Sequence, residues 1–409
     1  MNMKNKWQEM ETANVESLIR QAFNVCTETT KALDAGHLDY FLQTAKHYFA
    51  PETLGTVKPK VIVFGTDFPA EIVYALTKMP PYWVIGGNRA FHAASDEEVP
   101  RDTDPVTRAA LGQLLAMKQA RDSALVIFPC ASDAQRKVAY FLQQKGWNVV
   151  TVWIPAVKDE AAQRGFLSEM DHTIRTICRH VGRRYSVFAL NRAVRYMNSI
   201  RSEMKTFLEA AEQNETFLSG RERMAVLDTF FYSTDLEEWR QELRKLTESI
   251  PKGTKSAQPR ALVIGSPIFF PNFKIPSLLS DAGVEICGTV DCRSGQYRCS
   301  LGTQVENGME SVAAYYFKHD SSSAFVQNEE WKRAVCQAVE ETRPDGVIWH
   351  VLKGQIEYDF ELNRCEAYLE EQDLPVIRLE TDYQEQDVEQ LRIRIEAFGE
   401  LLTQKKKEK

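Results

Sequence analysis

The chemistry open to this chain depends first on its eight cysteines, because thiolates are the usual ligands of iron–sulfur clusters and of many transition metals. Cys287, Cys292 and Cys299 form the densest group, in CGTVDCRSGQYRC. Cys130 stands alone in FPCASD, directly after a predicted buried strand. The spacing of the dense group matches no common ferredoxin or zinc signature. Metal ligation and ordinary buried thiols therefore both stay open for these cysteines.

A second group with possible chemistry ends another predicted strand, GVIWH. His350 is the last residue of that strand, and Lys353 follows it in the next loop. The pKa of a histidine suits proton transfer near neutral pH, and a lysine offers a cation to a polarised oxygen. We predict a catalytic role for both residues. The alternative is a hydrogen-bonded pair with a purely structural role.

Alternating strand and helix patterns predict the unit that positions Cys130. The expected strands are VIVFG from Val61, YWVIGG, SALVIFP and VVTVWIP, with helices at 71–78 and 133–145 between them. Such alternation is typical of a parallel sheet covered on both faces. Ligands bind at the carboxyl ends of the strands in sheets of this kind, so the loop of Cys130 is a candidate site.

Changes in the pattern divide the chain into four parts. Residues 1–50 predict an N-terminal helical extension, and residues 51–157 predict the first α/β lobe. Residues 158–257 contain helix patterns without a convincing strand and predict a helical connector. Residues 258–409 predict a second α/β lobe with strands ALVIGSP, GVEICGTVD, GVIWHVL and LPVIRLE. The predicted fold is therefore two parallel-sheet lobes with a helical extension and a helical connector.

The two lobes share an order of strand, short loop, helix and strand around Cys130 and around Lys353. An internal repeat would make the two strand-end loops equivalent. Generic βαβ units also look alike, so shared architecture without a repeat is an equal alternative.

Composition and charge limit the class of protein. The chain has 44% hydrophobic and 26% charged residues and a formal net charge of -7, which is typical of a globular protein and unfavourable for nucleic-acid binding. We expect no cluster of lysine and arginine before the lysines at 405–409, which suit the end of a helix. We find no signal peptide and no run of ~18 apolar residues that would span a membrane. A cytoplasmic protein with reduced thiols, without nucleic-acid or membrane binding, is predicted.

The C-terminal segment LKGQIEYDFELNRCEAYLEEQDLPVIRLETDYQEQDVEQLRIRIEAF resembles the closing motif of the 2-hydroxyacyl-CoA dehydratase and benzoyl-CoA reductase family, in its B-type subunits. FPAEIVYALTKMPPYWVIGG is similar to the first helix and turn of that family, and ALVIFPCASDAQRK to its second strand-end loop. With ALVIGSPIFFPNFKIPSLLSDAGVEICGTVDC, the resemblance covers about residues 60–400. The connector matches only in its helical character.

The resemblance implies flavodoxin-like lobes and an enzyme subunit that eliminates water from a 2-hydroxyacyl-CoA by radical chemistry. It implies an acyl-CoA substrate beside an iron–sulfur cluster, expected as [4Fe–4S], with Cys130, Ser132 and Gln355 next to the cofactor and His350 and Lys353 as catalytic residues. A second family subunit or a second copy of the chain, and an ATP-dependent iron–sulfur activator protein, are the implied partners. The candidate metal ligands are Cys130, Cys287, Cys292 and Cys299.

The sequence departs from the family at the loops that usually carry cluster cysteines. The Cys-Asp pair of the family aligns with Ser132 and Asp133. Beside Ala-Leu-Gly, where the family often has a cysteine, this chain has Pro105, Val106 and Thr107. In the third loop, a cysteine is common near the position of Gln355. Oxygen and amide donors bind cluster iron poorly. Two alternatives therefore stay open: a reductase subunit of the benzoyl-CoA or double-cubane type, and a cluster-free partner subunit.

Overall fold

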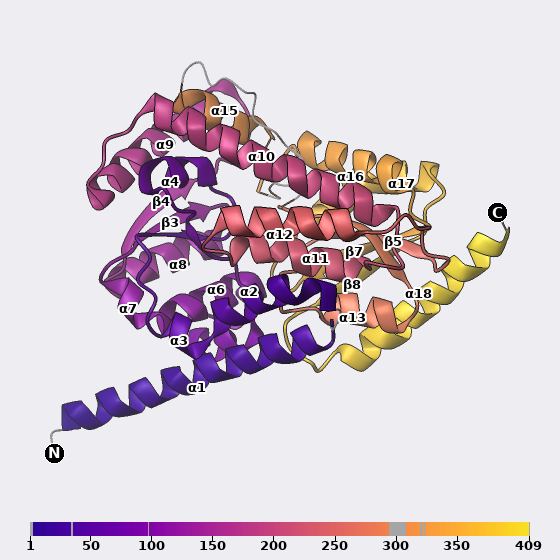
Figure 1. The fold of residues 1–409 in the computed structure, drawn as a ribbon, viewed down its shortest axis with the longest axis horizontal. Helices are drawn as coiled ribbons and strands as arrows, with labels where there is room; N and C mark the ends of the chain where they lie inside the picture. The colour runs from indigo at the N-terminus through magenta and orange to yellow at the C-terminus, as the bar shows by residue number, and fades with distance from the viewer. Residues whose placement is uncertain are drawn as a thin grey trace.

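Two four-stranded parallel sheets form the framework of the computed structural model, which describes residues 3–33, 36–96, 98–293, 308–319, 322 and 324–408 (Figure 1). The first sheet contains, in spatial order, β2 (Tyr82–Val84), β1 (Val61–Phe64), β3 (Leu125–Cys130) and β4 (Asn148–Trp153). The second contains β6 (Glu285–Val290), β5 (Arg260–Gly265), β7 (Gly346–Leu352) and β8 (Val376–Thr381). The predicted α/β fold with two parallel-sheet lobes is confirmed.

The two sheets have the same strand order, so β3 and β7 occupy equivalent third positions in sequence. Both strands are buried along their whole length, because helices cover both faces of each sheet and require a continuous apolar run. The edge strands β4 and β8 are partly exposed. The loops of Cys130 and Lys353, which follow β3 and β7, are therefore topologically equivalent, whether or not the lobes arose by duplication.

Helices cover the first sheet on two sides. One side carries α4 (Ala70–Thr77) and α9 (Glu160–Val181), and the other carries α6 (Pro105–Ala116) and α8 (Asp133–Gln144). Ser132 caps the start of α8 in a capping box. Its hydroxyl accepts the Gln135 backbone N–H, and the Gln135 side chain accepts the Ser132 backbone N–H. Shorter helices connect these elements: η2 (Arg89–Phe91), α5 (His92–Ser95) and α7 (Lys118–Arg121).

The second sheet packs between α16 (Glu329–Thr342) with α17 (Glu357–Glu371) on one side and α13 (Lys274–Asp281) with α18 (Val388–Glu408) on the other. A separate apolar core that includes Trp331 and Trp349 fills the space under α16 and α17. The helix α15 (Met309–His319) leaves this lobe and packs against α9 of the first lobe.

Helices between the sheets join the two lobes. They are α10 (Val187–Glu212), α11 (Gly220–Asp228), η3 (Thr229–Phe231) and α12 (Leu236–Ser249). A buried network holds α10 to both neighbours: Arg201 pairs with Glu71 of α4 at 2.5 Å and donates to the Tyr316 hydroxyl of α15 at 2.8 Å. The predicted boundaries at 157/158 and 257/258 fall between elements, and the division into four domains stays a prediction.

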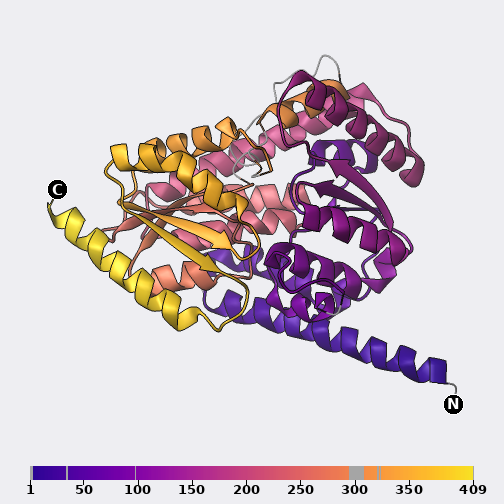
Figure 2. The same ribbon diagram turned by 180° about the vertical axis from the view of Figure 1, so that it is seen from behind.

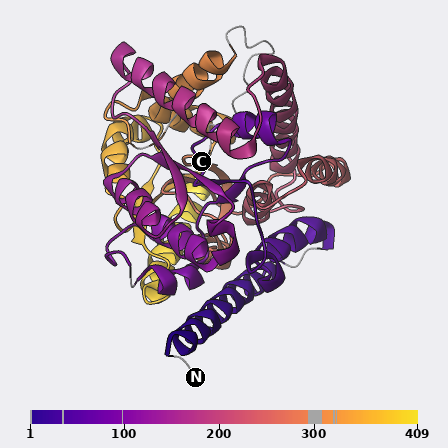
Figure 3. The ribbon, with the colours of Figure 1, turned by 90° about the vertical axis from the view of Figure 1, so that its left-hand side faces the viewer.

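The N-terminal helices are α1 (Met3–Lys31), η1 (Gly36–Leu38), α2 (Asp39–Phe49) and α3 (Pro51–Leu54). Figures 2 and 3 show α1 along one side of the molecule, with its N-terminal end projecting from the body. Asn88 of the first lobe donates to the Ala22 carbonyl at 2.8 Å, and Thr29 donates to the Pro271 carbonyl of the second lobe at 3.1 Å. This helix therefore contacts both lobes. Within the described residues, no helix is long and apolar enough to cross a membrane.

Candidate functional site

Residues that follow strand ends in one lobe contact residues that follow strand ends in the other. Thr66, after β1, has its hydroxyl 3.8 Å from the Cys292 sulfur after β6. The His92 ring stacks on the Tyr383 ring after β8, with centroids 5.2 Å apart. We call this boundary, formed by the residues after β1, β2, β5, β6, β7 and β8, the seam. Carboxyl ends of parallel strands are where doubly wound folds bind ligands, so the seam is the candidate site.

A hydrogen bond between an amide and a carboxylate crosses the seam. Gln355 Nε2 donates to Asp104 Oδ1 over 3.3 Å, and the same oxygen caps α6 by accepting the Thr107 backbone N–H at 2.9 Å. Burial raises the pKa of Asp104, although these donors oppose the rise. Gln355 Oε1 is also buried and has no hydrogen-bond partner among the described residues. It is a polar atom that a water or a ligand would satisfy.

Two glycines let the backbones of the two lobes touch. A Cβ on Gly354 would lie 2.9 Å from the Asp102 carbonyl oxygen, and a Cβ on Gly87 would lie 2.7 Å from the Phe270 carbonyl oxygen. Both glycines also have positive φ, at +86° and +89°, which residues with a side chain rarely adopt. Any other residue at either position would push the lobes apart, so the sequence encodes a closely packed seam.

Each lobe buries one histidine next to the seam. His92 Nε2 lies 2.9 Å from the Pro105 carbonyl oxygen, and His350 Nδ1 lies 2.8 Å from the Ser266 carbonyl oxygen. A carbonyl oxygen only accepts, so these two ring nitrogens carry the proton. Burial lowers the pKa of each histidine to about 4, and both are neutral at pH 7. His350 is therefore a weak base in a structural hydrogen bond, and its catalytic role stays a prediction.

Two lysines of the second lobe differ in exposure. Lys353 is exposed, and its Nζ donates to Asp382 at 2.9 Å; this hydrogen bond raises the pKa of Lys353, which is a cation at neutral pH. Lys274, which the sequence analysis did not single out, has only 6% of its side chain exposed and donates to Asp387 and to the Gln384 carbonyl at 2.6 Å each. Burial lowers the pKa of Lys274. The catalytic role predicted for Lys353 stays a prediction.

A pocket of about 280 Å³ opens between the lobes beside Lys274. Residues of α1 form one wall, Gly87 and Arg89 of the first lobe form another, and residues of α13 form a third. An ion pair between Arg89 and Glu385 spans the two lobes at this pocket. Its lining also includes the carboxylates of Glu28, Asp281 and Glu385, so the cations at this pocket are balanced by acidic side chains.

A buried ion cluster supports the end of β6. Arg293 forms ion pairs with two carboxylates, those of Asp291 and of Asp228 in α11. Its Nε lies 3.1 Å from Asp291 Oδ2. Its guanidinium also lies over the Phe269 ring, 4.8 Å from the centroid. Asp228 accepts the Phe270 backbone N–H at 2.8 Å, and burial raises its pKa to about 6. The cluster joins the connector to the loops after β5 and β6, and the sequence analysis missed it.

Three of the four cysteines predicted as metal ligands lie in the described part of the chain, and these three do not converge. The Cys130 thiol is buried, donates to the Phe128 carbonyl at 3.4 Å and has its pKa raised to about 12 by burial. Cys287 lies in the second-lobe core, whereas Cys292 lies at the seam. Cys299 falls outside the described residues. No group of three or more histidine, cysteine or acidic side chains suited to a metal occurs in the described part of the chain.

The donor set at the three loops does not fit an iron–sulfur cluster either. Asp104 and Gln355 bond each other, and the Ser132 hydroxyl caps α8. A cluster needs thiolates or comparably soft ligands, which carboxylate, amide and hydroxyl groups are not. Of the residues predicted beside a cofactor, the structure brings Gln355 to the seam and leaves Ser132 and Cys130 in the cap and core of the first lobe.

Comparisons with known proteins point to dehydratase subunits. The family model described as 2-hydroxyglutaryl-CoA dehydratase, D-component, matches residues 66–402. The putative dehydratase subunit YjiM of Escherichia coli (strain K12) is 25% identical over 354 residues, which cover 84% of this chain and 91% of the relative. The (R)-phenyllactyl-CoA dehydratase beta subunit of Clostridium sporogenes is 22% identical over 259 residues, which cover 62% of this chain and 68% of that protein.

Proposed function

Because this chain belongs to the 2-hydroxyglutaryl-CoA dehydratase D-component family, we propose that it is a subunit of a 2-hydroxyacyl-CoA dehydratase-type enzyme in which a partner subunit holds the iron–sulfur cluster. The reaction is the elimination of water from a 2-hydroxyacyl-CoA. The observation that carries the proposal is the hydrogen bond between Asp104 and Gln355, which occupies loops where the family usually places cluster cysteines.

The residues of the seam have a role in this proposal that needs no cluster of their own. The close approach at Gly87 and Gly354 brings the backbones of the two lobes into contact at these two points. In the pocket beside Lys274 and Arg89, a thioester oxygen or a phosphate of an acyl-CoA would compete with Asp387 for Lys274 and with Glu385 for Arg89. This chain would then bind and orient the substrate at the interface with the partner that performs the electron chemistry.

An exposed apolar surface supports a partner subunit. It consists of six side chains with 44–68% of their surface exposed. They are Tyr140, Trp153, Val157, Val326, Ile356 and Phe360. Large apolar and aromatic side chains gathered on a surface are typical of protein interfaces. We call this group the apolar surface.

Hydrogen bonds and one ring contact connect segments of both lobes that carry residues of the apolar surface. Arg136, one turn before Tyr140 on α8, lies over the Trp153 ring at 5.1 Å. Val326 donates its N–H to the Ala156 carbonyl at 2.8 Å, next to Val157. Arg364, one turn after Phe360 on α17, donates to the Val326 carbonyl at 3.2 Å. These contacts join α8 and the end of β4 in the first lobe to the loop before α16 and to α17 in the second.

A family subunit is the partner that this surface fits best. The two arginines at its border are paired, Arg136 with Asp133 and Arg364 with Glu329, so the surface presents little net charge. A neutral apolar interface suits a permanent subunit contact better than a transient encounter. The relative from Clostridium sporogenes is itself named as a beta subunit.

The test is anaerobic co-expression with a family subunit that has cysteines at all three loop positions. We expect the chain alone to be free of iron and acid-labile sulfide and to be inactive. Together with the partner and an ATP-dependent activator, the pair should eliminate water from a 2-hydroxyacyl-CoA, with (R)-phenyllactyl-CoA as the first substrate to try. Stoichiometric iron in the chain purified alone would refute the cluster-free role.

The apolar surface gives this experiment a matched pair of variants. Phe360→Asp should abolish co-purification and activity, because it places a charge in the middle of the interface. Ile393→Asp changes an equally exposed apolar residue on α18, outside the apolar surface, and should leave both unchanged. Equal loss from both variants would point to poor folding or solubility and would remove the support for this interface.

In a second candidate function, this chain itself holds an iron–sulfur cluster. The chain would then act either as the dehydratase or as a reductase of the benzoyl-CoA or double-cubane type. The observation in its favour is the position of Cys292 at the seam, beside Thr66 of the opposite lobe. Cys299 follows seven residues later in the sequence. Under this candidate, Cys292→Ser and Cys299→Ser would each remove iron from anaerobically purified protein, whereas Cys336→Ser would not.

A further inference from the structure

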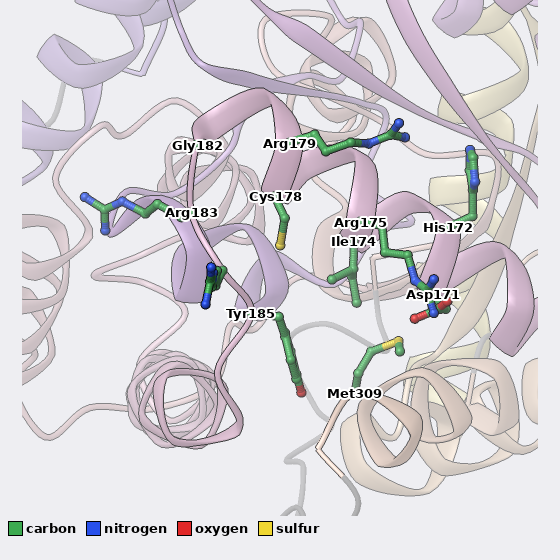
Figure 4. Close-up of a pocket in the computed structure, with 11 residues that line it drawn as sticks. Asp171, His172, Ile174, Arg175, Cys178, Arg179, Gly182, Arg183, Tyr185 and Met309 are labelled. Carbon is green, nitrogen blue, oxygen red and sulfur yellow. Dashed lines mark ion pairs between the residues drawn. The ribbon is translucent and has the colours of Figure 1, made fainter.

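Two hollows of similar volume open beside helices of the first lobe, and they differ in what could fill them. One, of about 910 Å³, lies at the C-terminal end of α9, where Ile174, Tyr185 and Met309 form apolar walls (Figure 4). Arg179 and Arg183 point in opposite directions there, so these two cations do not converge on a ligand. The other is a groove of about 880 Å³ along α1.

The α1 groove, as we call it, lies between α1 and the helices α5, α6 and α7 of the first lobe. Apolar side chains line it on the side of the lobe: Ala93 is exposed, Leu115 is partly buried and Trp147 is buried. Its volume is about that of two turns of an α-helix ~10 Å wide. The groove therefore has the size and the apolar wall that would accommodate a helix.

The helix α1 extends beyond this groove at its N-terminal end. The part of α1 that lines the groove begins at Asn14, and residues 3–13 precede it as ~16 Å of further helix. Figures 2 and 3 show this end of α1 projecting from the body of the molecule. A helix end in this position can reach a second molecule.

One face of α1 runs from the groove into the projecting end. Asn14, Ser17 and Gln21 line the groove, and their spacing of three and four residues places them on one face of the helix. In the sequence, Trp7 and Met10 continue the same spacing toward the N-terminus. The apolar residues of the projecting end therefore belong to the groove face of α1.

The face of α1 that packs on the body changes character where the helix leaves the body. Ile19 and Ala22 are buried in the core. Four, seven and eleven residues before Val15, or one helical turn at a time, the same stripe is occupied in the sequence by Glu11, Gln8 and Lys4. The projecting end is thus polar on the body face and apolar on the groove face.

We propose that two copies of this chain pair through their first helices, with residues 3–13 of each copy in the α1 groove of the other. In an antiparallel pair of α1 helices with a twofold axis near Thr12, Trp7 lies opposite Ser17 of the second copy, and Met10 lies opposite Asn14. The largest residue of the end then meets a small one, which is how helix pairs interdigitate.

A second copy fits this groove better than a helix of another protein. Each copy has one projecting end and one groove on the same helix face, so a twofold pair fills both grooves and covers both ends. A foreign helix would fill the groove and leave the projecting end of α1 uncovered. The pairing goes beyond the proposed function, because it involves neither the seam nor the apolar surface and would join two of the proposed complexes.

Sedimentation velocity of the full chain, from about 1 to 100 µM, tests the pairing. We expect a dimer with a Kd of about 10 µM or lower. Trp7→Asp should weaken dimerisation at least tenfold, because it places a charge against the apolar wall of the groove. Gln8→Asp changes the net charge equally at the next position, on the body face of α1, and should change the Kd less than twofold.

A variant of the groove itself tests the reciprocal contact. Ala93→Glu should also weaken dimerisation at least tenfold, whereas Ala397→Glu, at an exposed alanine of α18, should not. In an equimolar mixture, the Ala93→Glu copy keeps its projecting end and the Trp7→Asp copy keeps its groove. The mixture should therefore contain more dimer than either variant alone.

Three outcomes overturn the proposal. The first is a chain that stays monomeric at 100 µM, and the second is equal dimerisation of Trp7→Asp and Gln8→Asp. The third is a mixture with no more dimer than the separate variants. A dimer that withstands Trp7→Asp but is lost in Phe360→Asp falls under the second outcome and lies at the apolar surface instead.

Discussion

The two lobes have the same strand order but end their strands in different chemistry. The first lobe ends β3 in an uncharged group, with the Cys130 thiol in the core and the Ser132 hydroxyl in a helix cap. The second lobe ends β6, β7 and β8 in ionic groups, such as Arg293 with Asp291 and Lys353 with Asp382. The topology therefore sets where functional groups can lie, and the residues at each strand end set what they can do.

The seam combines these two unlike halves, so neither lobe forms the candidate site alone. Asp104 of the first lobe needs Gln355 of the second, and His92 of the first stacks on Tyr383 of the second. A small apolar cluster of Ala109 with Leu352 and Tyr383 supports the same contact. Removing a buried charge at the strand ends of the second lobe should be more disruptive than removing an exposed one.

The largest effect is expected from the buried ion cluster of the second lobe. Arg293→Met would leave Asp228 and Asp291 buried without their cation, which should lower the free energy of unfolding at pH 7 by about 3–5 kcal/mol. The loss should shrink as the pH falls below the pKa of Asp228, about 6, because a protonated carboxyl group is less costly to bury. Urea denaturation at pH 7 and pH 5 measures both effects.

The control for this prediction is an exposed arginine. Arg333 pairs with Glu330 and has 64% of its side chain exposed, so Arg333→Met should change the free energy of unfolding by less than about 1 kcal/mol. If Arg293→Met costs no more than this control, the buried cluster does not hold the end of β6.

The two buried histidines should make both lobes sensitive to acid. The folded pKa of each is about 4, below the usual 6.5, so their contribution to stability is fully present above pH 6.5 and is lost as the pH falls toward 4. The loss amounts to about 3 kcal/mol for each histidine. His350→Asn keeps an N–H donor for the Ser266 carbonyl, and His92→Gln keeps one for the Pro105 carbonyl, but neither variant can be protonated.

Comparison of each variant with the wild type isolates the histidine. The raised pKa of buried acids such as Glu285, about 7, acts in the opposite sense, but it is common to all three proteins. Between pH 7 and pH 4.5, the wild type should therefore lose more free energy of unfolding than either variant. Parallel curves would mean that the histidine in question is accessible to protonation in the folded state.

A smaller effect is expected from the hydrogen bond across the seam. Gln355→Leu would remove the amide donor to Asp104 and leave a buried carboxylate with one fewer partner, at a cost of about 1–3 kcal/mol. Gln372→Leu changes an exposed glutamine at the end of α17 and serves as the control. Thermal unfolding of the two variants would distinguish them, and equal melting temperatures would show that the seam does not depend on this bond.

The sequence predicted the strands well because buried parallel strands are continuous apolar runs, and it predicted the strand-end loops because topology fixes them. It did not predict the contacts across the seam. Asp104 caps α6 and Pro105 begins it, but nothing in the local sequence indicates that the partner of Asp104 is Gln355, 251 residues away. The burial of Arg293 is likewise a tertiary property, which local patterns do not encode.

The smallest effect on stability should come from Lys353→Ala. Because stability should hardly change, any loss of activity in this variant would report on function. Lys353 is exposed, and a surface ion pair with Asp382 contributes less than about 1 kcal/mol. Lys353→Ala should therefore leave the free energy of unfolding nearly unchanged. If this lysine binds the substrate, the same variant should lower dehydration by the reconstituted complex at least tenfold, whereas Lys332→Ala on α16 should not. Normal activity of Lys353→Ala would leave the lysine a structural role only, in which it pairs the ends of β7 and β8.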